Sequence, residues 1–316
     1  MGYSLQYYLL KAYIFFKGVK RNFSNDPINY KQIRNSDIHH PRGRFFTEDI
    51  VKRFSIADTQ ITQLQRDEHS KRLIIFVHGG AFVSGPGKLH WDVVKKIYKK
   101  SNHTIWFCDY PKSPECSIEE ISNNVDFVYQ RAIQKFEPNN IIMLGDSVGG
   151  TLIMALVQRL VSNAIQVPSK LILVSPICDA TFSNPDIALL EKKDILLGLK
   201  GVRSAKRMAA KNIRLEDSII SPINGSFKFF PKTILFLAEH DITFPDQILL
   251  ANKLMFANGE HRVVIGRGMP HMWAFFPMMP EAKKALNDII QEINADYPKL
   301  PSKGKYNMQA FKRVYK

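Results

Sequence analysis

The fold of this chain is decided at residues 141–155, which read Ile141-Ile-Met-Leu-Gly145-Asp-Ser147-Val-Gly149-Gly150-Thr-Leu-Ile-Met-Ala155. The pattern Gly-x-Ser-x-Gly separates a short apolar run from a helix-compatible run, which predicts a strand that turns sharply into a helix at Ser147. Glycines at 145 and 149 allow the strand and the helix to approach closely. The helix would then point its free N–H groups and its positive dipole end at the serine. On its own, the pattern also fits a glycine-rich turn with an incidental serine.

The chain has 316 residues, of which 45% are hydrophobic and 11% aromatic. These values are typical of a folded globular protein with a large core, and we expect one domain over 1–316. The formal net charge of +15 would suit an anionic substrate, a membrane surface or nucleic acid. Because the basic residues are scattered and no zinc-finger or RRM-like motif accompanies them, we expect no nucleic-acid partner.

The three cysteines, Cys108, Cys116 and Cys178, are odd in number and have no CxxC spacing. This pattern favours reduced thiols and a cytoplasmic protein. We find no convincing signal peptide and no apolar run long enough to cross a membrane. We expect neither a cofactor nor a metal, and the sequence leaves the oligomeric state open.

Strands and helices alternate from residue 72 onward. The predicted strands cover 72–77, 104–108, 140–144, 171–174, 233–237 and 262–265, and the predicted helices cover about 90–100, 118–136, 148–162, 246–258 and 281–296. This alternation indicates an α/β fold with a mostly parallel sheet and helices on both faces. Residues 45–61 lack a helical period and predict two antiparallel edge strands.

Two segments depart from this alternation. Between 180 and 220 we predict two helices, 186–199 and 202–213, with no strand between them, and we interpret the insertion as a helical cap. Residues 3–19 predict another helix, because one apolar stripe has helical spacing. The stripe consists of Leu5, Tyr8, Leu9, Ala12, Phe15, Phe16 and Val19. We favour a helix that packs on the body or acts as a lid, and peripheral membrane contact remains an alternative. The basic tail 299–316 is expected to be loosely attached.

A serine hydroxyl needs a base and an acceptor that orients the base before it can attack an acyl carbon. Asp241 and His271 each follow a predicted strand, and loops at the carboxyl ends of parallel strands meet at one sheet edge. The order serine, acid, histidine is that of Ser147, Asp241 and His271. Glu239 and His240 are weaker candidates because they lie on or beside the strand. We therefore predict Ser147 as nucleophile, Asp241 as acid and His271 as base.

A second motif, His78-Gly79-Gly80-Ala81, follows the predicted strand 72–77. Consecutive small residues leave backbone N–H groups exposed to a site, where they would form an oxyanion hole together with the N–H of Val148. The alternative is a tight turn that needs glycines only for its conformation. His78 itself lies before the serine, which is the wrong chain order for the base.

Four motifs resemble those of the hormone-sensitive-lipase-like α/β-hydrolases. They are His78-Gly79-Gly80-Ala81-Phe82, Asp109-Tyr110 with Pro114-Glu115, Gly145-Asp-Ser-Val-Gly149-Gly150, and Gly268-Met-Pro-His271. The resemblance implies an α/β-hydrolase fold and a carboxylic-ester hydrolase with the triad given above. It also implies that Gly80, Ala81 and Val148 donate to the oxyanion, and that a cap is built from 1–40 and 180–220.

The chain departs from the family pattern at three positions. Ala81 replaces a third glycine, Val148 replaces an alanine, and Asp241 is followed by Ile242-Thr243, where a proline is frequent. We expect these changes to affect substrate shape and not catalysis. The sequence thus predicts a serine esterase for small-molecule esters with short to medium acyl chains. The alternatives are an amide or acetyl-group hydrolase with the same triad, and a non-catalytic membrane-associated binding module.

Overall fold

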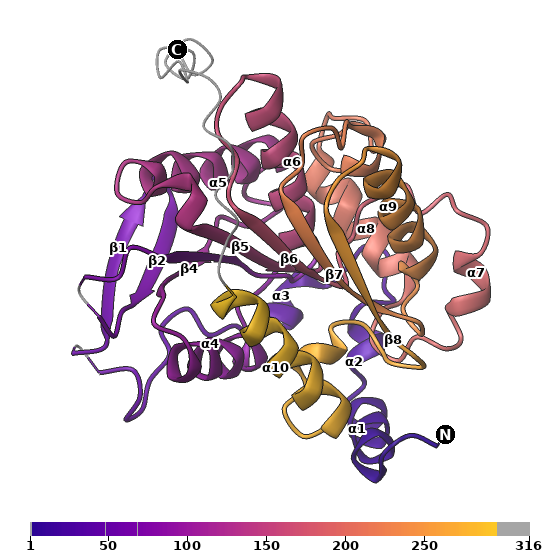
Figure 1. Cartoon of the computed structure of the whole chain (residues 1–316). Coiled ribbons are helices and arrows are strands. Elements are labelled where there is room, and N and C mark those ends of the chain that lie inside the picture. The colour runs from indigo at the N-terminus through magenta and orange to yellow at the C-terminus, as the bar shows by residue number, and fades with distance from the viewer. Residues whose placement is uncertain (1, 48, 68, 296–316) are drawn as a thin grey trace.

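An eight-stranded sheet runs through the described part of the molecule in the order β1-β2-β4-β3-β5-β6-β7-β8 (Figure 1). The computed structural model describes residues 2–47, 49–67 and 69–295. The strands are β1 (Val51–Ile56), β2 (Thr59–Leu64), β3 (Leu73–Val77), β4 (Thr104–Asp109), β5 (Ile141–Asp146), β6 (Lys170–Val174), β7 (Lys232–Ala238) and β8 (His261–Gly266). β1 pairs with β2 and β2 with β4 in antiparallel fashion, and all later pairs are parallel. The mostly parallel sheet and the two antiparallel strands at its edge are confirmed.

Helices cover both faces of the sheet (Figure 1). The helices on one face are α4 (Lys88–Lys100) and α10 (Pro280–Asn294), and those on the other are α5 (Ile118–Ile133), α6 (Val148–Ser162) and α9 (Phe244–Phe256). Each face therefore has its own apolar core. All five residues of β3 are buried, as is typical of a strand covered by helices on both sides. No helix in the described ranges has the length and apolar character needed to span a bilayer.

The inserted segment is less helical than predicted. It contains the single turn α7 (Ile187–Leu190) and the helix α8 (Leu199–Ala210), so the prediction of a helix over 186–199 is wrong. The carboxylate of Asp194 accepts hydrogen bonds from the backbone N–H groups of Leu196 and Leu197. A side chain that bonds its own following backbone competes with the helical ladder and turns the chain.

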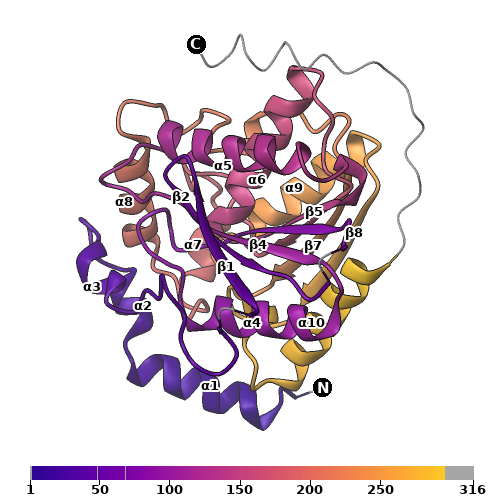
Figure 2. The same cartoon turned by 90° about the vertical axis from the view of Figure 1, so that its left-hand side faces the viewer.

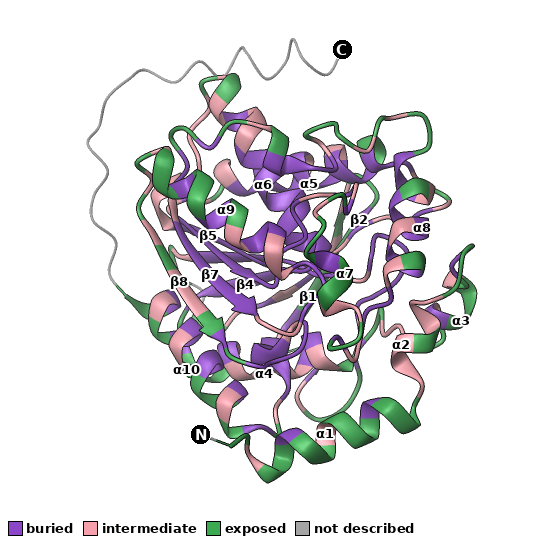
Figure 3. Ribbon diagram, turned by 90° about the vertical axis from the view of Figure 1, so that its right-hand side faces the viewer, coloured by how far each residue is buried: buried purple, intermediate pink, exposed green. Residues whose placement is uncertain are grey.

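The N-terminal segment forms α1 (Leu5–Phe16), α2 (Val19–Asn22) and α3 (Tyr30–Arg34). The predicted helix over 3–19 is interrupted at Gly18, whose φ of 61° is left-handed. The residues of α1 that are buried are Tyr7 and Ile14. Most of the predicted apolar stripe faces away from the body instead, and Figure 3 shows most of α1 as exposed. The helix thus packs on the body as predicted, but through Tyr7 and Ile14; of the stripe, Val19 packs against the core.

The two segments predicted to build a cap touch each other. The backbone N–H of Ile28 donates to Ser204 Oγ at 3.0 Å, and Arg207 pairs with Asp26 at 2.6 Å. A Cβ added at Gly201 would lie 2.1 Å from the carbonyl oxygen of Phe23. Residues 1–40 and 180–220 are thus packed together where the structure describes them. The predicted loose tail, 299–316, lies outside the described residues.

The backbone of α6 passes unusually close to β3. A Cβ added at Gly149 would lie 2.0 Å from the carbonyl oxygen of Val77 and 2.9 Å from that of His78. No methyl group fits at such a distance from backbone atoms, so only glycine allows this crossing. The start of α6 is consequently pinned against the strand that precedes the His78–Ala81 loop.

We predict that Gly149→Ala lowers the free energy of unfolding by about 3 kcal/mol or more, because the added methyl must push the start of α6 away from β3. The matched control is Gly87→Ala, since an added Cβ at Gly87 meets no atom within 4 Å. Gly87 has a φ of −109°, which any residue adopts, so its change should stay within about 1 kcal/mol. Urea unfolding curves measure both. Equal stabilities would contradict the close crossing.

Candidate active site

Ser147 occupies a strained turn between β5 and α6, with φ of 52° and ψ of −122°. Holding a non-glycine residue in such a region costs on the order of 1–3 kcal/mol, and the surroundings must enforce it. Here the backbone N–H of Ser147 donates to the carbonyl of Val174 at 3.0 Å, and its carbonyl accepts from Gly150 and Ile177, each at 3.1 Å. The sharp strand-to-helix turn predicted from the sequence is present, with the serine at its apex.

Asp241 and His271 form a buried pair. The Nδ1 atom of His271 lies 2.5 Å from Oδ2 of Asp241, and the two residues are 3% and 0% exposed. Because a carboxylate only accepts, Nδ1 carries the proton and Nε2 is left as the acceptor. Asp241 also accepts from Thr243 N and Oγ1, each at 2.8 Å, and from Gln247 Nε2 at 3.0 Å. These donors hold the carboxylate in a fixed position beside the imidazole.

The loop after β6 connects the serine turn with the histidine loop. Val174, the last residue of β6, binds the N–H of Ser147, and Oγ of the next residue, Ser175, accepts from Met272 N at 3.0 Å. Ser147, Asp241 and His271 follow β5, β7 and β8, which lie side by side with β6 in the sheet. Within the described residues no hydrogen bond joins Ser147 Oγ to His271. Catalytic hydrogen bonds are frequently made only in the substrate complex.

The competing acids and bases face elsewhere. Glu239 accepts from the backbone N–H of Gly268 at 2.6 Å, and it therefore supports the histidine loop from outside. His78 is fully buried, and its ring stacks on Tyr110 with centroids 4.5 Å apart. Burial lowers the pKa of His78 to about 4. The side chain lies in contact with its own loop, where Nδ1 is 2.5 Å from the carbonyl oxygen of Gly79.

The glycine loop after β3 lies directly against Ser147. A Cβ added at Gly79 would be 2.8 Å from Cβ of Ser147. Gly80 and Ala81 both have positive φ, of 125° and 56°. In the described chain, no hydrogen bond is recorded from the backbone N–H of Gly80, Ala81 or Val148 to a protein acceptor. The predicted oxyanion loop and the predicted serine are thus brought together, with unbonded amides beside them.

The comparisons with known proteins agree with this geometry. A family model described as the alpha/beta hydrolase fold matches residues 74–275, which contain the glycine loop, the serine turn, Asp241 and His271. The chain belongs to the alpha/beta hydrolase fold family. The resemblance to hormone-sensitive-lipase-like proteins is confirmed at the level of family and fold, and this hydrolase has several named relatives.

An esterase of Acinetobacter venetianus is 28% identical over 247 residues, which cover 76% of this hydrolase and 80% of the relative. A carboxylesterase/phospholipase of Mycobacterium tuberculosis is also 28% identical, over 70% of this chain and 61% of its own. A solved Staphylococcus aureus structure, assigned provisionally as an esterase, superposes with a TM-score of 0.81 at 27% identity, covering 90% of this chain and all of that one. An esterase structure from the bacterial hormone-sensitive lipase family has a TM-score of 0.79 at 18% identity over 93% and 98% of the two chains, and shares the fold.

Sequence reasoning missed Asp194, a second buried carboxylate close to Asp241. Its Oδ2 accepts from the backbone N–H of Ile242 at 2.9 Å, and Ile242 directly follows Asp241. Burial, followed by the negative charge of Asp241, raises the pKa of Asp194 to about 6. No motif surrounds Asp194, and its segment was predicted as helix, so no sequence signal identified it.

The charges around His271 change its protonation. Burial alone would lower the pKa of His271, but the charge and hydrogen bond of Asp241, with the further charge of Asp194, raise it above its ordinary value. The imidazolium form is therefore stabilised relative to a histidine in water. His271 therefore loses its proton, and can accept another, only as the pH rises through this raised pKa.

A second unanticipated residue is Lys206 of α8. It is fully buried, its Nζ lies 4.1 Å from the ring centroid of Phe82, and it has no hydrogen-bond partner in the described residues. Burial lowers its pKa to about 7. Phe82 directly follows the glycine loop, so α8 contacts the residue next to that loop.

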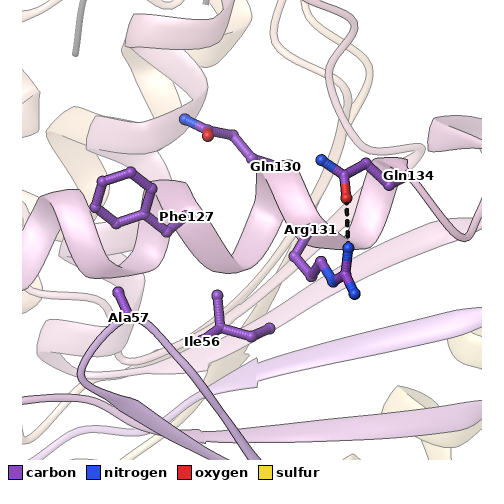
Figure 4. Close-up of a pocket in the computed structure, with 6 residues that line it drawn as sticks. All are labelled: Ile56, Ala57, Phe127, Gln130, Arg131 and Gln134. Atoms are coloured by element: carbon purple, nitrogen blue, oxygen red, sulfur yellow. Dashed lines mark hydrogen bonds between the residues drawn. The ribbon is translucent and has the colours of Figure 1, made fainter. Parts of the chain in front are cut away.

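None of the predicted site residues lines either of two further pockets. One, of about 300 Å³, lies between the β1–β2 turn and α5, lined by Ile56, Ala57, Phe127, Gln130, Arg131 and Gln134 (Figure 4). The other, of about 500 Å³, is lined mainly by the residues just before β3 and just before β4. Within the described ranges, no three His, Cys, Asp or Glu side chains are grouped so that they could hold a metal ion.

Proposed function

We propose that this hydrolase cleaves carboxylic esters of short to medium acyl chain length through an acyl-enzyme on Ser147. The observation that carries the proposal is the buried Asp241–His271 pair at 2.5 Å, placed on the same sheet edge as the strained serine. The family membership and the relatives named as esterases support carboxylic-ester hydrolysis as the reaction class. The serine mechanism and the acyl length are our inference from the site.

In the proposed reaction, His271 Nε2 accepts the proton of Ser147 Oγ as Oγ attacks the acyl carbon. The negative charge on the tetrahedral oxygen is stabilised by the N–H groups of Gly80, Ala81 and Val148, and each such donor contributes about 2.7–4 kcal/mol. His271 then gives its proton to the departing alcohol. Water, activated by the same histidine, releases the acid and restores the serine.

The surroundings of the serine support the expected acyl length. Ser147 is only 5% exposed, and α8 reaches the neighbouring glycine loop through Lys206 and Phe82. A nucleophile enclosed in this way favours small acyl groups over long ones. We propose that 1–40 and 180–220 act as the cap that encloses the substrate. The cytoplasmic location remains a prediction from the cysteines, all three of which are free.

We expect Ser147→Ala to reduce hydrolysis of p-nitrophenyl acetate and butyrate by roughly 10⁴-fold or more, since the nucleophile of a triad is lost. Ser162→Ala is the matched control, because Ser162 is an exposed serine at the other end of α6. It should retain full activity and full labelling by a fluorophosphonate probe at Ser147. Circular dichroism establishes that both variants are folded.

Retained turnover in the folded Ser147→Ala variant would refute the acyl-enzyme. A wild-type protein that neither hydrolyses these esters nor reacts with the probe would favour the non-catalytic binding module. Labelling together with turnover of anilides in preference to esters would favour the amide hydrolase. An acyl-chain series from acetyl to long-chain esters tests the proposed length directly.

The pH dependence follows from the raised pKa of His271. The base must be neutral, so kcat/KM should fall on the acid side of a midpoint that lies above the ordinary histidine value of about 6.5. Asp194→Asn removes a negative charge that stabilises the imidazolium, and it should move this midpoint to lower pH. Asp186→Asn, at an exposed acid in the same insertion, should leave it unchanged. An unmoved midpoint in folded Asp194→Asn would contradict the electrostatic contribution of Asp194.

A further inference from the structure

The outer face of α1 exposes an unusual concentration of large apolar side chains. Leu5, Tyr8, Leu9, Tyr13, Phe15 and Phe16 are between 52% and 84% exposed. Positions 5, 8, 9, 13 and 16 recur at helical spacing, so most of these side chains form one continuous row. The helix lies on the outside of the molecule in both views (Figures 2 and 3). We call this row the α1 face.

The charged residues of the segment that carries the α1 face are all positive. Residues 2–25 contain Lys11, Lys17, Lys20 and Arg21 and no aspartate or glutamate. Lys11, Lys17 and Arg21 are exposed. The first acidic residue, Asp26, is paired with Arg207. An apolar row with cations beside it complements a surface with an apolar interior and anionic groups at its boundary with water.

Specific contacts hold the α1 face outward. The hydroxyl of Tyr7 donates to the carbonyl of Gly268 at 3.1 Å, and the N–H of Ser4 donates to Glu281 at 3.0 Å. Beyond the helix, Lys20 Nζ donates to the carbonyl of Asp194 at 2.8 Å. These bonds lie on the side opposite the exposed row. Rotation of the helix to bury the row would break them.

We propose that the α1 face docks on an anionic lipid bilayer. A helix of 12 residues is about 18 Å long, which suits a position in the plane of the interface. Its tyrosines and phenylalanines would enter the boundary between head groups and acyl chains, and its cations would meet anionic head groups. The proposal goes beyond the ester chemistry, because it needs none of the catalytic roles.

Docking at α1 would place the bilayer across one helix from the histidine loop and the inserted segment. Gly268, which binds Tyr7, is three residues before His271, and Asp194, which binds Lys20, is bonded to Ile242. The segment α1–α2 therefore connects the histidine loop with the inserted segment. Esters dissolved in the bilayer would reach the site along this side of the molecule.

The test is flotation of the full chain with phosphatidylcholine vesicles that contain or lack phosphatidylglycerol. The wild type should bind the anionic vesicles. The triple variant Leu9→Ser, Tyr13→Ser, Phe16→Ser should lose at least about tenfold in affinity, because the buried apolar area is removed. The matched control is Leu189→Ser, Phe229→Ser, Phe256→Ser, three side chains between 73% and 81% exposed elsewhere on the molecule. It should bind as the wild type does.

Charge is tested separately with Lys17→Gln and Arg21→Gln. Each should weaken binding to phosphatidylglycerol vesicles by about fivefold and leave binding to phosphatidylcholine unchanged. Ser147→Ala should bind like the wild type, so failure of the catalytic proposal would leave this one intact. Circular dichroism confirms the fold of each variant.

Three results would overturn lipid docking. The wild type could fail to float with any vesicle, or both triple variants could bind equally. Light scattering could also show a dimer that only the α1 variant loses, without vesicle binding. In that last case a second copy of the chain covers the α1 face.

Discussion

The structure of the site depends on one constraint, the close approach of three backbone segments around Ser147. The start of α6 crosses β3 at Gly149, and the loop after β3 contacts the serine at Gly79, at distances that exclude a methyl group. Because these segments cannot separate, the backbone of Ser147 is held in its strained conformation and the amides of the glycine loop remain beside it. The buried apolar strands form a rigid sheet, and Gly79 and Gly149 allow the backbone around Ser147 to pack directly against it.

Much of this arrangement could be predicted from the sequence, because its signals are local. Continuous apolar runs identify the buried strands, and Ser147, Asp241 and His271 each follow such a run. Local signals fail where a distant contact decides the outcome. The spacing of apolar residues in α1 predicts a stripe, but the bond from Tyr7 to Gly268 determines which side faces the body. The helix predicted over 186–199 ends at Leu190 instead. The carboxylate of Asp194 accepts from the backbone N–H of Leu196 and, in a contact with a distant part of the chain, from that of Ile242.

Three parts of the chain that are distant in sequence meet near Asp241: the N-terminal segment, the inserted segment and the loop after β7. Lys20 binds the backbone of Asp194, and the carboxylate of Asp194 binds the residue after Asp241. The N-terminal segment is therefore linked to the Asp241–His271 pair through only two hydrogen bonds. The bond from Ile242 to Asp194 holds a residue of the inserted segment near His271, and its charge contributes to the raised pKa of His271. The outward-facing α1 belongs to the same N-terminal segment, so a chain of direct contacts joins the α1 face to the loops that carry Asp241 and His271.

The positions in the sheet of the strands that lead to Ser147 and His271 also determine which part of the site unfolds first. β5, which leads to Ser147, is fully buried between β3 and β6, whereas β8, which leads to His271, is the last strand and, among the described residues, pairs with β7 alone. Edge strands open locally at a lower free energy than central ones. Gradual heating would therefore release the loop that carries His271 before the serine turn loses its shape.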